Sequence, residues 1–190
     1  MAGEETPIAG EETPMDGEPT PMDGEPTPPE VMWSAFVSTH PGEVSPESPY
    51  AVWHFGDDQR MADELAELVC RGTKRATAGA LWSYEAGGEP VPRAGDLSVV
   101  TDWTGRARCV VRTTGVAIVA FDDVTPEFAA AEGEGDGSLE HWRQVHWEFF
   151  TRELRALDKA PRLDMPVVCE RFEVVFGGLA PAPGEGGGAP

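Results

Sequence analysis

The chain has 190 residues, enough for one domain of ordinary size, and its 34 acidic against 14 basic residues give a net charge of −20. This balance argues against a long nucleic-acid footprint, because phosphate binding draws on clustered cations, and no DNA partner is expected. Three cysteines without a CxxC pair predict neither a zinc site nor a disulfide framework. With no long apolar run and no secretion leader, the sequence predicts a cytoplasmic protein without a membrane partner.

The first thirty residues have the composition of an acidic tail. Residues 2–29 divide into four seven-residue units, AGEETPI, AGEETPM, DGEPTPM and DGEPTPP. Every unit carries proline, and residues 1–30 hold nine acids and no base, so a disordered segment is predicted rather than a coiled coil. Residues 177–190 are rich in glycine and proline and are predicted to be flexible. One domain remains, residues 31–176, with a net charge of −10.

Hydrophobic periodicity and capping residues predict helices interspersed among strands. The predicted helices run from Asp57 or Asp58 to Arg71, from Thr125 to Ala131 and from Ser138 to about Leu157. The predicted strands are Pro49–Phe55, Leu97–Thr101, Ala107–Phe121 with a break near Gly115, and Pro166–Phe176. Because strands and helices do not alternate in βαβ units, these elements indicate an α+β fold around a small β-barrel.

Three aromatic side chains of the longest predicted helix are expected to be structural. His146 falls in the middle of its apolar face, which favours a core histidine bonded to the backbone over a catalytic one. Trp142 and Trp147 are likewise expected in the core rather than as platforms for nucleobases.

The turn Gly72–Thr77 brings a lysine and a threonine within three residues of each other, directly after a predicted helix. Lysine is rare here, with two against twelve arginines, and it is the cation whose pKa burial can lower enough for base catalysis. The alternative is structural: Gly72 ends the helix, and Lys74 and Arg75 lie at its negative end.

A second unusual segment alternates acids and glycines, with Glu132, Glu134 and Asp136 separated by single glycines. It begins like a calcium loop, but Arg143 stands where the twelfth position requires a bidentate glutamate, so an EF-hand is excluded. No metal or other cofactor is predicted, although weak magnesium or manganese binding stays open. The glycines are expected to let the backbone approach a ligand closely.

Together these segments resemble the ASCH domain family, a relative of the PUA fold found in RNA-modifying proteins. The resemblance runs from about Tyr50 to Phe176. It is carried by Gly72–Thr77, Trp82-Ser83-Tyr84-Glu85, Pro92-Arg93-Ala94-Gly95-Asp96, the acidic turn with Trp142 and His146, and Val168-Cys169-Glu170-Arg171-Phe172. It implies a small PUA-like β-barrel with flanking helices, and RNA or a small modified nucleoside as partner.

The resemblance also implies three alternative activities. Some small ASCH proteins use a lysine, a threonine and a glutamate to deacylate N4-acetylcytidine. Here Lys74 would be the neutral base, Thr77 the nucleophile, and Glu132 or, second, Glu134 the acid. Other ASCH proteins resemble ribonucleases, in which Lys74 and Tyr84, the latter expected on a strand, would transfer protons. The third alternative is a binding module without chemistry. The residues expected to bind substrate are Gly72, Arg75, Trp82 and Arg143.

Overall fold

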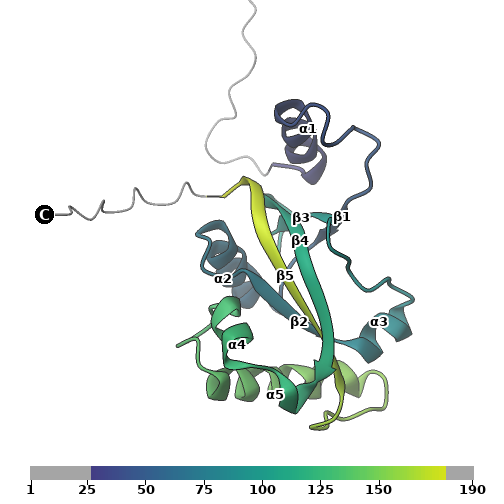
Figure 1. Ribbon diagram of the computed structural model, residues 1–190, viewed down its shortest axis with the longest axis vertical. Helices are drawn as coiled ribbons and strands as arrows, with labels where there is room; N and C mark the ends of the chain where they lie inside the picture. The colour runs from purple at the N-terminus through teal and green to yellow at the C-terminus, as the bar shows by residue number, and fades with distance from the viewer. Residues whose placement is uncertain (1–26, 179–190) are drawn as a thin grey trace, which may run out of the picture.

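The computed structural model describes residues 27–178, which form an α+β domain around one curled five-stranded sheet (Figure 1). The helices are α1 (Pro29–Thr39), α2 (Gln59–Cys70), α3 (Leu81–Gly87), α4 (Pro126–Glu132) and α5 (Leu139–Arg155), with a 3-10 turn at Phe121–Asp123. The strands are β1 (Ala51–Trp53), β2 (Ala76–Ala80), β3 (Leu97–Thr101), β4 (Ala107–Ala120) and β5 (Pro166–Gly177). The predicted fold class is confirmed.

The sheet is a curled half-barrel. Its strand order is β1-β3-β4-β5-β2, in which β1 runs parallel to β3 and the other neighbours are antiparallel. The long strands β4 and β5 form the centre and cross most of the domain (Figure 1). The break expected near Gly115 is a register shift between Thr113 and Gly115 within one continuous strand. Such shifts bend a strand, which helps the sheet to curl.

Helices cover the sheet and enclose three groups of buried apolar side chains. Helices α4 and α5 pack on the first group, α2 on the second and α1 on the third. In Figure 1, α1 and α5 lie at opposite ends of the sheet, with α2 and α4 on one side of it. The three predicted helices are confirmed as α2, α4 and α5. Each begins after a side-chain cap, made by Asp58, Thr125 and Ser138 respectively.

The sequence did not predict α1, α3 or β2. Helix α1 begins with Pro29, the last residue of the repeats, and buries Trp33 and Phe36. Its lead-in also contacts the sheet, because the Ala107 amide donates to the Thr27 carbonyl over 2.8 Å. The rest of the predicted acidic tail (residues 1–26) and most of the predicted flexible tail (residues 179–190) lie outside the described residues.

The expectation that Tyr84 lies on a strand is wrong, because it lies in α3. That helix has no side-chain cap and only seven residues, so its start carries no sequence signal. Throughout residues 27–178, no helix is both long and apolar enough to cross a membrane.

Candidate functional site

The turn after α2 holds Lys74 in place by its backbone. Gly72 adopts φ +72°, which lets the chain reverse, and the Thr73 and Lys74 amides both donate to the Leu68 carbonyl over 3.0 and 3.1 Å. The Arg75 amide then donates to the Ala131 carbonyl at 2.8 Å. The turn is therefore fixed between the end of α2 and the end of α4.

The acidic-glycine segment follows α4 and lies directly against this turn. Glu132 is the last residue of α4, and Gly133 takes φ +66°. A Cβ at Gly133 would stand 2.6 Å from the Thr73 carbonyl oxygen, far inside van der Waals contact. The close approach that the glycines permit here is thus between two segments of backbone, whereas a ligand had been expected.

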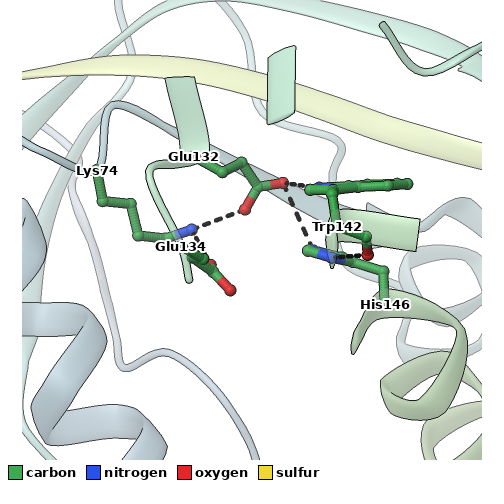
Figure 2. Close-up of polar contacts among 5 residues, drawn as sticks. All are labelled: Lys74, Glu132, Glu134, Trp142 and His146. Atoms are coloured by element: carbon green, nitrogen blue, oxygen red, sulfur yellow. Dashed lines mark hydrogen bonds and ion pairs between the residues drawn. The ribbon is translucent and has the colours of Figure 1, made fainter. Parts of the chain in front are cut away.

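The two segments meet in a buried ionic cluster (Figure 2). The Lys74 Nζ lies 2.7 Å from Glu132 Oε2 and 2.5 Å from Glu134 Oε1. The side chains of Lys74 and Glu132 are each 1% exposed, and that of Glu134 is 20% exposed. Two of the predicted glutamates therefore share one ammonium, and Glu134 is the one that reaches solvent.

Helix α5 supplies the remaining contacts of Glu132. The Trp142 indole Nε1 donates to Glu132 Oε1 over 2.8 Å, and His146 Nε2 lies 3.5 Å from the same oxygen (Figure 2). The two rings stack with centroids 4.1 Å apart. His146 Nδ1 lies 3.0 Å from the Trp142 carbonyl oxygen, so the expected core histidine bonded to backbone is confirmed. The core position of Trp142 is confirmed as well, whereas the one expected for Trp147 is wrong, because Trp147 is 36% exposed.

These contacts fix the charge of the cluster. Burial alone would lower the pKa of Lys74, but the adjacent Glu132 and Glu134 carboxylates outweigh it and raise the pKa above its ordinary value. Burial would raise the pKa of Glu132, yet Lys74, and after it His146, holds that pKa below its usual range. The lysine is therefore an ammonium, and the neutral Lys74 expected from the sequence is wrong. The reason is that the turn buries Lys74 against two carboxylates, which stabilise its charged form.

Thr77 lies in strand β2, beyond the turn in which the sequence analysis had placed it. It stands directly opposite Glu170 of β5, and directly opposite residues of an antiparallel pair point to the same face. Tyr84 covers that face, since a Cβ on Gly79, two residues along the strand, would lie 2.9 Å from its ring. Burial, followed by the nearby Glu170, raises the pKa of Tyr84 to about 12. Within residues 27–178, no hydrogen bond joins Thr77 to Lys74.

The structure does not bring the predicted substrate-binding side chains into the Lys74 cluster. Arg75 is exposed. Trp82 packs on the core beneath Lys159, whose Nζ lies 4.7 Å from the ring centroid. Arg143 is paired with Asp122, donating to its carbonyl over 2.6 Å and lying 3.0 Å from its carboxylate. Of that set, only Gly72 takes part, through the turn.

Sequence reasoning did not consider Glu170 as a site residue. A signal existed, because Glu170 lies between the apolar residues Val168 and Phe172 on one face of the last strand. A charged residue is seldom buried on such a face unless it has a partner. Within the described part of the chain, no three histidine, cysteine or acidic side chains are grouped to hold a metal ion.

Gly133→Ala tests the contact between the two segments. We expect it to destabilise the protein by more than the roughly 1–2 kcal/mol of a left-handed alanine, because the Cβ would collide with the Thr73 carbonyl. Gly137→Ala is the matched control, since Gly137 has φ +71° but nothing nearer its Cβ than 4.0 Å. Urea unfolding of both variants measures the difference, and equal losses would show that the contact is unimportant.

Comparisons with known proteins agree with this fold. The sequence model of the ASCH domain matches residues 51–176. The crystal structure of an ASCH domain from Lactobacillus crispatus JV V101 is 36% identical, with a TM-score of 0.74, and the match covers 78% of this chain and 94% of that one. A protein from Enterococcus faecalis V583 is also 36% identical, with a TM-score of 0.70 over 77% of this chain and 87% of its own. The comparison with curated proteins finds no match. The extent of the family match and the identity of these two structures establish that the chain belongs to the ASCH domain family.

Proposed function

We propose that the protein is an amidohydrolase that removes an acyl group from the exocyclic nitrogen of a modified cytidine, of the N4-acetylcytidine type. The observation that carries this proposal is the buried Lys74 ammonium, held between Glu132 and Glu134 at the turn that leads into Thr77. An ammonium held in a fixed position suits acyl transfer, in which negative charge develops on the carbonyl oxygen.

A chain of aromatic contacts links the ammonium to the face of the sheet that carries Thr77. The Lys74 Nζ lies 5.1 Å from the centroid of the Phe55 ring, and that ring lies 6.4 Å from the ring of Phe172. Phe172 is two residues from Glu170 on β5, so it shares the face of Glu170 and of its partner Thr77. The ionic cluster and the face that carries Thr77 thus meet at the same group of buried apolar side chains.

The proposed reaction has two steps. The Thr77 oxygen attacks the acyl carbon while its proton passes to a base, and the Lys74 ammonium stabilises the negative charge on the carbonyl oxygen. The bond from carbon to nitrogen then breaks, and the Lys74–Glu134 pair supplies the proton that the leaving nitrogen takes. Water next attacks the threonine ester and gives one proton back to the Lys74–Glu134 pair, while the base returns its proton to the threonine oxygen. This releases the carboxylic acid and restores the hydroxyl.

Two observations favour this reaction over cleavage of RNA. With its pKa raised to about 12, Tyr84 is poorly suited to accept a proton from a 2′-hydroxyl near neutral pH. The net charge of −10 over residues 31–176 also favours a small substrate over a polyanion.

The test is to incubate the protein with N4-acetylcytidine and, separately, with a short RNA, each with and without manganese. We expect release of acetate from the nucleoside, independent of manganese, and no shortening of the RNA. Glu134→Gln should lower the rate by about 100-fold or more, the usual size of an acid–base contribution. Glu140→Gln, on the exposed side of α5, is the matched control and should leave the rate unchanged.

Other outcomes of this test would reject the proposal. Shortened RNA without acetate release would identify a ribonuclease. Retention of the nucleoside or the RNA without any product would identify a binding module. Equal rates for Glu134→Gln and the wild type would remove Glu134 from the reaction.

A further inference from the structure

The proposed reaction needs a base that the ionic cluster does not supply. Lys74 already carries its proton, and the carboxylates of Glu132 and Glu134 are both engaged with its ammonium. The proton of the Thr77 hydroxyl must therefore pass to another group near β2. This step deepens the proposed function and rests on it.

Glu170 is the carboxylate that the sheet brings to Thr77. The two residues are direct partners in the β2–β5 pairing, and their flanking pairs, Ala76 with Arg171 and Ala78 with Cys169, are also in register. Directly opposite residues have Cβ atoms about 4.5–5.5 Å apart. The three further bonds of a glutamate side chain let its oxygens reach a neighbouring hydroxyl across that distance.

The Glu170 carboxylate is buried and held by a hydrogen bond, unlike a charge on the protein surface. Its side chain is 6% exposed, and the Thr113 hydroxyl, on the other neighbouring strand, donates to its Oε1 over 2.5 Å. Among residues 27–178, its Oε2 has no side-chain donor. One oxygen is thus held from the β4 side, while no side-chain donor among the described residues, Thr77 included, bonds the other.

The surroundings of Glu170 also favour proton transfer. Burial raises its pKa, Thr113 opposes that effect, and the Asp96 carboxylate adds to it. Tyr84 lies on the same face, near Glu89 and Glu153 as well, and its own raised pKa keeps it neutral around pH 7. A buried carboxylate with a raised pKa is a stronger base than an exposed one.

We infer that Glu170 is the catalytic base that accepts the Thr77 proton. As the Thr77 oxygen forms its bond to the acyl carbon, the proton passes to the Glu170 carboxylate. In the second step, water gives one proton back to the Lys74–Glu134 pair as its oxygen bonds to the acyl carbon. Glu170 returns to the carboxylate form by giving its proton to the threonine oxygen as that bond breaks. Thr113 is a positioning residue, since it acts through Glu170.

The test uses p-nitrophenyl acetate, an activated ester whose p-nitrophenolate group leaves without taking a proton from the protein. The rate of acetylation is followed by p-nitrophenolate release and by the intact mass of the full-length protein, and peptide mapping locates the acetyl group. We expect acetyl-Thr77 in the wild type and an at least 100-fold slower acetylation in Glu170→Gln. Glu173→Gln, on the exposed side of the same strand, should behave as the wild type.

A pH profile separates catalysis from a structural role. The acetylation rate of the wild type should fall as acid protonates Glu170, and Glu170→Gln should lack this fall. Thr113→Val should keep the fall at a shifted pH, because it removes only the hydrogen bond to Glu170. Melting temperatures of all variants confirm that they remain folded.

The outcomes distinguish this inference from the proposed function. Wild-type acetylation rates in folded Glu170→Gln would overturn the role of Glu170 and leave the hydrolysis of N4-acetylcytidine untouched. Acetylation that depends on Glu170, without hydrolysis of N4-acetylcytidine, would support Glu170 and reject the substrate. A wild type that is not acetylated on Thr77 would overturn the inference.

Discussion

Lys74→Met should lower the free energy of unfolding by about 3–5 kcal/mol at pH 7, the usual cost of removing one partner from a buried ion pair. The methionine fills a similar volume but leaves the carboxylates of Glu132 and Glu134 without their cation. Most of this loss comes from Glu132, because its side chain is 1% exposed and water cannot replace the cation. Urea unfolding at equilibrium measures the loss.

The loss should shrink at pH 5. In the wild type, the pKa of Glu132 is lowered on folding, so its contribution to stability is present above the unfolded pKa of about 4.3 and is lost as pH falls through the folded pKa. In Lys74→Met, burial acts without the cation and raises the pKa of Glu132. The cost of that buried carboxylate is then relieved as acid protonates it.

Lys159→Met is the matched control, because Lys159 is the other lysine of the chain and is exposed over the Trp82 ring. It should cost no more than about 1 kcal/mol, the size of an exposed cation–π contact. Similar losses in the two variants, or a loss in Lys74→Met that does not change with pH, would contradict the ionised cluster.

Local signals were sufficient for much of the fold. Helices α2, α4 and α5 each join a regular apolar face to a capping side chain, so both their existence and their starts were predictable. Helix α1 was missed because its first residue, Pro29, also completes the last repeat. Helix α3 was missed because no capping side chain precedes it.

Lys74, Thr77, Glu132 and Glu134 could be named as candidates from the sequence, but Glu170, the protonation of Lys74 and the pairing of Thr77 could not. Lys74 meets two carboxylates that lie 58 and 60 positions further along the chain, and these contacts reverse the effect of burial on its pKa. The pairing of Thr77 with Glu170 depends on the register between β2 and β5, which lie far apart in the sequence. No local pattern specifies such a register.

The direct test of the proposed chemistry is the hydrolysis of N4-acetylcytidine by Thr77→Val and Thr77→Ser, with acetate release as the measurement. Valine keeps the shape and strand preference of threonine but has no hydroxyl, whereas serine keeps the hydroxyl. We predict that the valine variant, folded as judged by its melting temperature, releases acetate only at the background rate, and that the serine variant retains part of the wild-type activity. Acetate release by Thr77→Val at the wild-type rate would contradict Thr77 as the nucleophile.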